Sequence, residues 1–436
     1  MPGVLVNSSN VCKLMPFILE VVGRASFLAI DTEFTGMGDL SKTKEADLEE
    51  RYKALKVIAD SHTVLSVGLS CFESLDGPSE PKEPSPSSPQ ECRTNAWTFT
   101  FLVRSLDDFT SSPSSLKFLV EHGMDFNMVF SQGIPFSKKN LESSQTPNAM
   151  QCLFKHITSL KKPIAVHNGL LDLLFLYNSF ICALPPTLAK FVADLKETFG
   201  EIIDTKYIAE VHAKEKLTFL EYVHKKSDRL NKTNKEKGLK HFNLIDKTEE
   251  VLQYLHQHSS PEIKPTPSCF TLCPNFQSLG YCKNISLCNY SHSVDQLLDI
   301  EDKLKESQKK HKRKRTPIHL EKPSKKKNQT LNMFDVLSHL PSQHHSDSDS
   351  ENPSTEEIVV AEGLSEGKEE EKPVLRNPHL EEASQKHNAG FDSYCTGLIY
   401  SHYKLTIPSN KLSDLSNKLF LMGKKVPLII YKSQFL

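Results

Sequence analysis

The sequence has no run of eighteen consecutive apolar residues, and basic residues followed by an apolar stretch are missing from its N-terminus. We therefore expect neither a membrane span nor a signal peptide. It also has almost no net charge, since 53 Lys and Arg against 54 Asp and Glu give −1, although the two signs are grouped in separate tracts. No internal repeat is present. Without a secretory signal, the ten cysteines are expected to be reduced, apart from any that bind metal.

An acidic pair follows a short apolar run near the N-terminus. Phe27 to Ile30 predict a buried strand, because four consecutive apolar residues require both faces of a sheet to be covered. With the period of two of a strand, Asp31 and Glu33 point to the same face, where they repel each other unless a cation lies between them. A single Asp-x-Glu is also compatible with an acidic turn, so its meaning depends on partner motifs.

A second acidic motif lies at residues 163–177. Ile164 to Val166 predict a strand, His167-Asn-Gly169 a turn, and the residues from Leu170 a helix that is buried on most sides. Asp172 falls within the first turns of that helix. A charge in so apolar a helix is costly unless it is paired, hydrogen-bonded or bound to metal. The alternative is a favourable contact with the helix N-terminus.

A third motif runs from His387 to Gly397. His387 and Asp392 are five residues apart, so they can share a site only if His387 precedes the first helical turn. Gly390 makes such a bend easy. The alternative is a surface histidine followed by a capping acid.

The sequences of the three motifs are D-x-E-F-T-G, H-N-G-L-x-D-x-x-F-L-Y and H-x-A-G-x-D-x-Y-x-T-G. In this order they resemble the exonuclease motifs of the DEDD superfamily of 3'-to-5' exonucleases, and within it the deadenylase branch that includes poly(A)-specific ribonuclease. Glu49-Glu-Arg-Tyr-Lys53 also looks like that branch. The resemblance covers residues 1–225 and 377–436, with boundaries uncertain by several residues. It implies that His387 is the catalytic histidine and that four acids bind metal: Asp31, Glu33, Asp172 and Asp392.

Phosphodiester hydrolysis explains why these residue types belong together. The reaction needs a hydroxide near neutral pH and neutralisation of charge on the attacking and leaving oxygens, and two cations roughly 3.5 to 4 Å apart meet both needs. Mg²⁺ takes oxygen ligands and keeps several waters, so four acids suit two Mg²⁺ ions per active site. Because histidine titrates near neutral pH, His387 is expected to be the general base.

A separate cluster has the spacing C-x8-C-x5-C-x3-H, and it predicts one Zn²⁺ in a small finger over residues 265–295. Its ligands are Cys273, Cys282, Cys288 and His292. The spacing is that of CCCH zinc fingers, which commonly bind single-stranded RNA. Lys283-Asn284 stand where an aromatic-glycine pair is usual, so the finger is expected either to bind RNA weakly or to contact a protein. Cys269 is expected to be a spare thiol.

The composition predicts two linkers. Residues 226–264 are expected to be a lysine-rich linker, and residues 296–376 a disordered linker, first basic and then acidic. The basic part includes Lys309-Lys-His-Lys-Arg-Lys-Arg315 and Lys325-Lys-Lys327. These clusters predict a nuclear localisation signal that binds an import receptor, an electrostatic arm for phosphates, or both. The alternative is a solvated charge run.

The predicted fold is α/β, of the ribonuclease-H-like exonuclease type that the resemblance implies, with a mixed sheet and helices on both faces. The exonuclease domain is expected in two parts, residues 1–225 and 377–436, separated by the zinc finger and the disordered insertion. Phe27 to Asp31 should be the central strand. Residues 64–72 and 97–103 should continue the sheet antiparallel, with further strands at 164–166 and 201–203. Asp204 is expected to be structural or to support the metal ligands.

A CCCH finger and a basic segment inserted before the third motif resemble the arrangement in nuclear deadenylases. This likeness implies a nuclear, Mg²⁺-dependent 3'-to-5' exoribonuclease that trims single-stranded A- or U-rich 3' tails, with small nuclear RNAs as substrates. Within the nucleus it would act in the nucleolus, Cajal bodies or speckles. One alternative is a catalytically weak RNA-binding adapter that uses the zinc finger, and another is a DNA exonuclease on the same fold.

Overall fold

The computed structural model describes residues 3–39, 41–76, 91–138, 148–258, 272–283, 288, 290–300, 302–303 and 388–431. The chain divides into two compact units. One combines Met1–Ser260 with Val374–Leu436, and the other is Pro261–Pro373. The first unit holds the three acidic motifs, and the second holds the four predicted zinc ligands.

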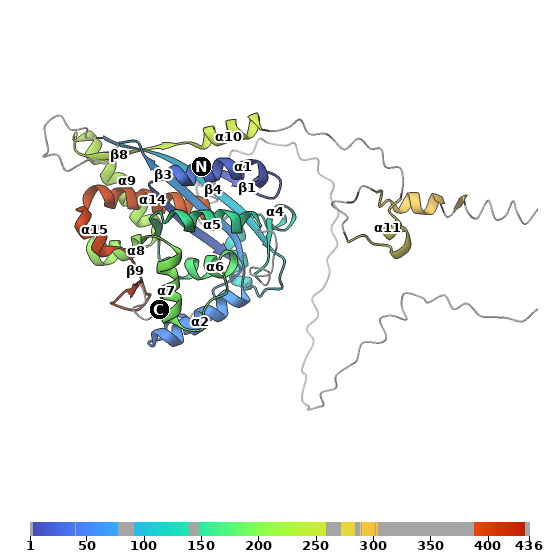
Figure 1. Cartoon of the computed structure of the whole chain (residues 1–436), viewed down its shortest axis with the longest axis horizontal. Helices are drawn as coiled ribbons and strands as arrows, with labels where there is room; N and C mark the ends of the chain where they lie inside the picture. The colour runs from blue at the N-terminus through green and yellow to red at the C-terminus, as the bar shows by residue number, and fades with distance from the viewer. Residues whose placement is uncertain are drawn as a thin grey trace, which may run out of the picture. The chain divides into compact units, whose positions relative to one another are not determined.

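The large unit is built on a mixed sheet (Figure 1). Its described strands are β1 (Val4–Val6), β2 (Phe27–Phe34), β3 (Val64–Ser74), β4 (Glu91–Ser105), β5 (Ile134–Phe136), β6 (Ile164–Val166), β7 (Ile202–Asp204), β8 (His241–Asp246), β9 (Lys418–Leu419) and β10 (Leu428–Ile429). Their order is β1-β4-β3-β2-β6-β7-β9-β10, and β5 and β8 pair with β4 off this path. β2, β3 and β4 are antiparallel neighbours, whereas β6 runs parallel to β2 and β7 parallel to β6. β2 therefore lies in the interior of the sheet.

Helices cover both faces of this sheet (Figure 1). The large unit contains α1 (Val11–Arg24), η1 (Lys42–Lys44), α2 (Leu48–Ser61), α3 (Pro113–Glu121), α4 (Phe126–Gln132), α5 (Ala149–Leu160), α6 (Leu170–Phe180), α7 (Leu188–Thr198), α8 (Thr205–Tyr207), the π-helical turn η2 (Ile208–His212), α9 (Leu220–Glu236), α10 (Thr248–Gln257), α14 (Ala389–Thr406) and α15 (Ser409–Leu415). On one face of β2, Leu28 and Ile30 pack into a core shared with α1, α5, α6 and α7. On the other face, Phe27 and Ala29 pack with α9 and α14. The alternation of side chains thus buries this strand on both sides.

The predicted mixed α/β fold is confirmed, and so are most predicted strands. The strand predicted at 27–31 extends to Phe34, the strands at 64–72 and 97–103 are β3 and β4, and the one at 201–203 is shifted by one residue in β7. None of the described helices is both long and apolar enough to cross a membrane.

The structure corrects the linker predicted over residues 226–264. Most of α9, together with β8 and α10, lies in this segment and belongs to the large unit. β8 pairs in parallel with β4, and Phe242 and Val251 are buried in its cores. The prediction was wrong because lysines cover the exposed side of α9 and its buried side has few apolar residues, so the segment has the composition of a linker. The first part of the folded domain therefore extends to residue 260 rather than 225.

The second unit contains the short helix α11 (Pro274–Leu279) and a helical stretch over residues 294–300. A β-bridge joins Leu272 to Ser291, so the two ends of the Cys273–His292 segment lie side by side. The predicted basic clusters and the acidic tract of the 296–376 linker lie outside the described residues.

Candidate active site

Asp31 and Glu33 lie where β2 leaves the core, because the strand changes there from fully buried to partly exposed. Asp31 is paired with Gly68 of β3. A Cβ atom at Gly68 would come within 1.8 Å of the carbonyl oxygen of Ala389, the first residue of α14. The glycine therefore allows the start of α14 to approach the acidic end of β2.

Asp172 reaches the same place from the first turn of α6, which follows the turn after β6. Its Oδ1 accepts hydrogen bonds from the backbone N–H of Thr32, at 3.0 Å, and from the hydroxyl of Thr32, at 2.6 Å. Thr32 stands between Asp31 and Glu33, so one residue ties the second motif to the first. No local sequence pattern indicates this contact between Thr32 and Asp172.

Asp392 lies in the first turn of α14. The helix begins where the side chain of Asn388 accepts the backbone N–H groups of Gly390 and Phe391, which is an N-cap. Residue 387 thus precedes the first turn in the sequence, as the predicted bend requires. His387 itself lies outside the described residues, so its role stays a prediction.

The carboxylates from the three motifs meet at the end of β2. One carboxylate oxygen from each of Asp31, Glu33 and Asp392 lies within 4.8 Å of the other two. Asp172 is close enough that its charge raises the pKa of each of these three acids. All four acids that the sequence predicted as metal ligands are therefore neighbours in the fold.

The pKa values of these acids are strongly raised. Burial is the largest cause for every one of them, and it raises the pKa of Asp31 and of Glu33 well above the usual range. The pKa of Asp172 rises to about 6 and that of Asp392 to about 7. For Asp31, Glu33 and Asp392 the neighbouring carboxylates raise the pKa further. Such a cluster is unfavourable when ionised unless positive charge balances it. This set of oxygen donors therefore fits a hard divalent cation such as Mg²⁺.

A fifth acid, Glu221, stands beside this cluster. It lies in the first turn of α9. Its charge raises the pKa of Asp392 and is the third largest cause of that shift, after burial and the charge of Asp172. It also forms an ion pair with Lys225, one turn along the helix, at 3.0 Å. Sequence reasoning gave Glu221 no role, because no local pattern indicates that it lies near Asp392, which is far away in the sequence.

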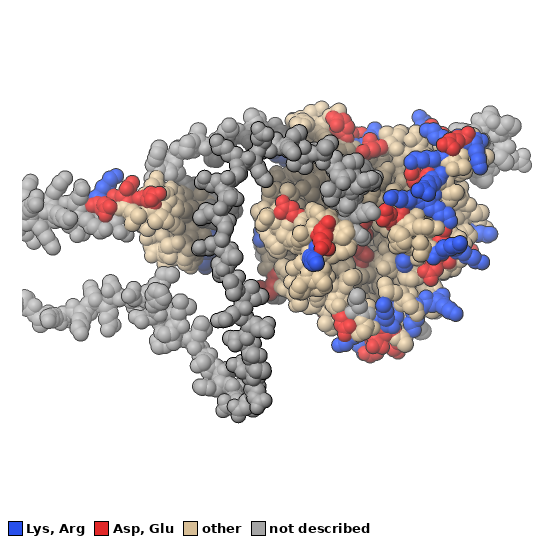
Figure 2. Space-filling view, turned by 180° about the vertical axis from the view of Figure 1, so that it is seen from behind, with Lys and Arg blue, Asp and Glu red and all other residues tan. Residues whose placement is uncertain are grey.

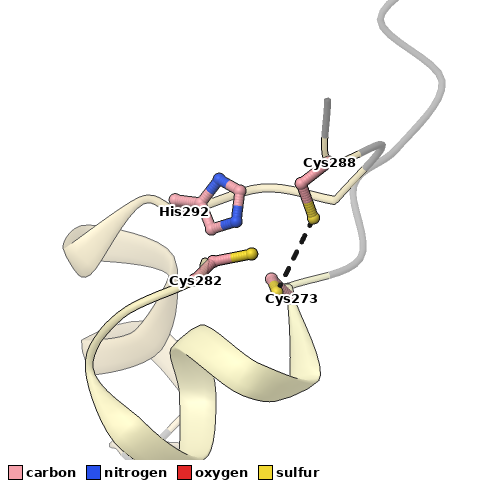
Figure 3. A group of neighbouring side chains, drawn as sticks. All are labelled: Cys273, Cys282, Cys288 and His292. Carbon is pink, nitrogen blue, oxygen red and sulfur yellow. Dashed lines mark hydrogen bonds between the residues drawn. The ribbon is translucent and has the colours of Figure 1, made fainter. Parts of the chain in front are cut away.

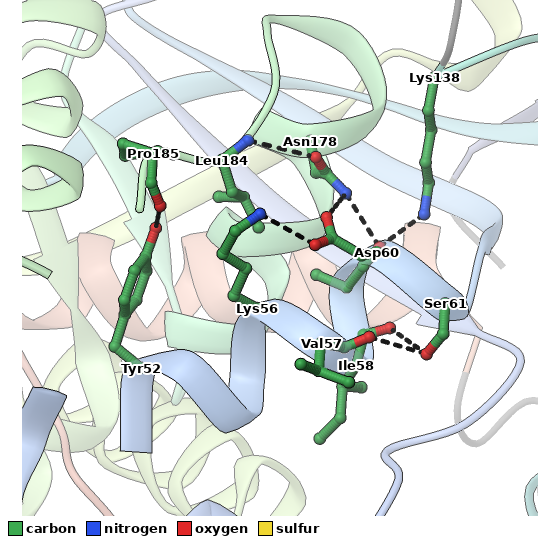
Figure 4. A network of polar contacts seen from close by, with 11 residues as sticks. Tyr52, Lys56, Val57, Ile58, Asp60, Ser61, Lys138, Asn178, Leu184 and Pro185 are labelled. Carbon is green, nitrogen blue, oxygen red and sulfur yellow. Dashed lines mark hydrogen bonds and ion pairs between the residues drawn. The ribbon is translucent and has the colours of Figure 1, made fainter. Parts of the chain in front are cut away.

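The helix that follows β2 is held against the helix that carries Asp172 (Figure 4). Asn178 of α6 donates to the carbonyl oxygen of Ala59 and to the carboxylate of Asp60, each at 3.0 Å. The ammonium of Lys138 donates to the carbonyl oxygens of Ala59, at 2.6 Å, and His62, at 2.5 Å. These donors satisfy the C-terminal end of α2, where carbonyl groups lack partners within the helix. These bonds therefore anchor α2 to α6, the helix that carries Asp172.

Two other polar residues of the motifs have supporting positions. Asp204 is fully buried and accepts the backbone N–H groups of Asn168, Lys206 and Phe420. It joins the turn before α6 to the ends of β7 and β9, which is the structural role expected for it. His167 lies between the hydroxyl of Thr205 and the carbonyl oxygen of Thr218, both at 2.9 Å from its ring nitrogens.

The four predicted zinc ligands come together in the second unit. Figure 3 shows the side chains of Cys273, Cys282, Cys288 and His292 converging, and their ligand atoms lie within 4.8 Å of one another. Hydrogen bonding from the backbone N–H of Phe276 is the main reason why the pKa of Cys273 is lowered to about 7. Nε2 of His292 is buried and has no hydrogen-bond partner within the described part of the chain. Three thiols and a nitrogen without a partner fit a tetrahedral Zn²⁺ ion.

A family model that describes the CAF1 ribonucleases matches residues 6–152 and 141–400. The chain belongs to the CAF1 ribonuclease family. The match spans both units and takes in all three acidic motifs, so the acids that converge at β2 lie within the family's shared region.

Three relatives that are named as ribonucleases or as a 3'-exonuclease match shorter segments of the chain. The poly(A)-specific ribonuclease PNLDC1 of Mus musculus is 28% identical over 34% of this chain and 28% of its own length. The pre-piRNA 3'-exonuclease trimmer of Bombyx mori is 46% identical over 16% of this chain and 13% of its own length. The poly(A)-specific ribonuclease PARN of Xenopus laevis is 28% identical over 37% of this chain and 27% of its own length. The chain thus spans less than a third of the length of each of these relatives.

Two solved structures align with about half of the chain at low similarity. Pop2p of S. pombe, in its Mg²⁺- and Mn²⁺-bound form, aligns with 52% of this chain and 82% of its own, at 20% identity and a TM-score of 0.37. The RNase domain of the yeast Pop2 protein aligns with 58% of this chain and 82% of its own, at 16% identity and a TM-score of 0.36.

Proposed function

We propose that this member of the CAF1 family is a Mg²⁺-dependent 3'-to-5' exoribonuclease. The observation that carries the proposal is the convergence of Asp31, Glu33, Asp172 and Asp392 from three distant segments. A fold gains nothing in stability from gathering four buried carboxylates whose pKa values are raised, so this arrangement favours a cation-dependent function. The names of the matched relatives, which are ribonucleases and a 3'-exonuclease, agree with this reaction class.

In this proposal the four acids would hold two divalent cations at the site that receives the RNA 3' end. When bound, the cations neutralise charge on the attacking and leaving oxygens and ease deprotonation of the attacking water. Thr32 keeps the Asp172 carboxylate in place through its two hydrogen bonds. His387 would take the proton from the attacking water as general base.

The finer proposal concerns substrate and compartment. The CCCH finger and the basic segment at 309–315, both inserted before the third motif, resemble the nuclear deadenylase called target of early growth response. On that likeness, we propose that the enzyme trims oligo(A) and oligo(U) tails from nuclear RNAs, among them small nuclear RNAs, and enters the nucleus through an import receptor. The zinc finger, holding one Zn²⁺, would contact RNA or a protein partner.

The test is cleavage of matched RNA and DNA oligonucleotides that end in A, U or C, with Mg²⁺ and with EDTA. We expect stepwise shortening of RNA from the 3' end in Mg²⁺ alone, and no activity in Asp31→Asn, whereas Asp414→Asn on exposed α15 cleaves like the wild type. Tight RNA binding without cleavage would instead support the adapter function, and equal degradation of DNA would support a DNA exonuclease.

A further inference from the structure

A cavity of about 220 Å³ lies between η2, α9 and α14 in the large unit, and the catalytic acids do not line it. Its polar lining includes His212, Glu215, Lys226, Ser227 and His402. Apolar side chains complete the wall, among them Val223 and Leu230 of α9 and Ile407, the residue that follows α14. The cavity therefore offers apolar surface and a few convergent polar groups, which is the usual composition of a small-ligand site.

His402 gives this cavity an unused hydrogen-bonding group. The residue is only 9% exposed, and its Nδ1 is buried without a hydrogen-bond partner in the described chain. Burial lowers the pKa of His402, so its ring is neutral near pH 7 and has one donor and one acceptor nitrogen. Buried polar atoms are nearly always paired, and this nitrogen has almost no exposed surface, so it gains a partner from the cavity only when the His402 ring turns towards a bound ligand.

The charges around the cavity favour a neutral ligand. Glu215 and Lys226 form an ion pair, and the Glu215 side chain is 13% exposed. A carboxylate in the wall repels a phosphate but accepts a hydrogen bond from an amino group. Together with the apolar surfaces of Val223 and Leu230, this pattern suits a flat heterocycle that carries an amine.

The surface around the cavity is basic. Residues 221–240 contain seven Lys and Arg but only three Asp and Glu, and Figure 2 shows lysine and arginine side chains gathered on the side of the molecule where α9 lies. The basic residues are Lys225, Lys226, Arg229, Lys232, Lys235, Lys237 and Lys240. Of these seven, only Lys225, Lys226 and Lys232 form ion pairs with acids among the described residues. The remaining cations are available to a phosphate backbone.

From these observations we propose that the cavity is a second nucleotide site, which binds an unpaired base with an exocyclic amine, such as adenine, from the RNA upstream of the cleaved nucleotide. The inference rests on the proposed RNA substrate. His402 and Asp392 lie ten residues apart on α14, which corresponds to roughly 15 Å along the helix axis. The bound base is therefore several nucleotides away from the 3' end, and short substrates do not reach the cavity.

Two variants of the full-length protein test this site. Leu230→Trp fills the cavity from its rim, where Leu230 is 43% exposed and tolerates a larger side chain, and His402→Phe removes the ring nitrogens. His122→Phe, at the residue that follows α3, is the matched control. Binding of 5'-fluorescein-labelled (A)10 and (U)10 is measured by anisotropy in EDTA, and cleavage of (A)10 and (A)3 is measured in Mg²⁺. Thermal unfolding of each variant shows that it is folded.

Loss of one base contact should weaken (A)10 binding by about tenfold in both cavity variants and weaken (U)10 binding less. The KM for (A)10 should rise in parallel, whereas the kcat and KM for (A)3 stay unchanged. If Leu230→Trp binds (A)10 as the wild type does, the site is refuted. Equal weakening of (A)10 and (U)10 would refute an amine-bearing base. If the variants weaken (A)10 binding but the wild type cleaves no RNA, the proposed function fails and the cavity site stands.

Discussion

Replacing Asp392 by Asn should stabilise the metal-free protein. In the fold its carboxyl has a pKa of about 7, compared with 3.8 for an unperturbed aspartate, which is a difference of about three pKa units. At about 1.36 kcal/mol per unit, the ionised side chain destabilises the fold by at most about 4 kcal/mol above pH 7. Because four coupled acids share this repulsion and the amide loses some contacts, we expect a gain of about 2 kcal/mol. That corresponds to a rise in Tm of about 5 °C for a domain of this size.

The sign of the pH dependence follows from the same shift. A folded-state pKa above the unfolded one means that the native protein binds more protons between about pH 4 and pH 7, so its stability falls as the pH rises through this window. The gain in stability of Asp392→Asn over the wild type should therefore be largest at pH 8 in EDTA and become smaller towards pH 4.

The assay is thermal unfolding followed by circular dichroism, in EDTA or Mg²⁺, with Asp414→Asn as the control for a loss of charge on the surface. Mg²⁺ should raise the Tm of the wild type more than that of Asp392→Asn, because only the wild type keeps the complete acidic set. If Asp392→Asn lowers the Tm at pH 8 in EDTA, or if Mg²⁺ stabilises both proteins equally, the electrostatic reasoning is wrong.

Three further predictions concern the two metal sites. Asp31→Ala or Glu33→Ala should abolish RNA cleavage and leave the circular dichroism spectrum nearly unchanged; unchanged turnover would remove these acids from the mechanism. Thr32→Val should remove the hydroxyl bond to Asp172 while keeping the backbone one, and raise the Mg²⁺ concentration needed for half-maximal cleavage about tenfold, since hydrogen-bonded supports of metal ligands typically affect affinity by 10- to 100-fold; an unchanged Mg²⁺ titration would contradict this role. Cys282→Ser should eliminate the bound zinc measured by mass spectrometry, and a full equivalent remaining would exclude the finger assignment.

Local patterns predicted the parts of the fold that depend on nearest neighbours along the chain. The apolar run at Phe27 to Ile30 indicated a doubly covered strand, and Asp172 was expected in the first turns of its helix; both are as predicted. The bond between Thr32 and Asp172 could not be predicted, because it joins positions 140 residues apart.

The segment after residue 225 shows a different limit of sequence reasoning. Its lysines lie on the solvent side of α9, and the helix is stabilised by packing against α14 and β8 rather than by a broad apolar face. A composition-based boundary therefore fell inside a folded helix. Glu221 and the cavity beside His402 were missed because both depend on the packing of α9 against α14, which are far apart in the sequence.

The most direct test of the account is a crystal structure of the protein soaked with Mn²⁺, with the metal positions taken from anomalous scattering. The account predicts two peaks roughly 3.5 to 4 Å apart at the end of β2, contacted by Asp31, Glu33, Asp172 and Asp392. Density without any peak among these four acids, from crystals of a protein that still cleaves RNA in Mn²⁺, would contradict it.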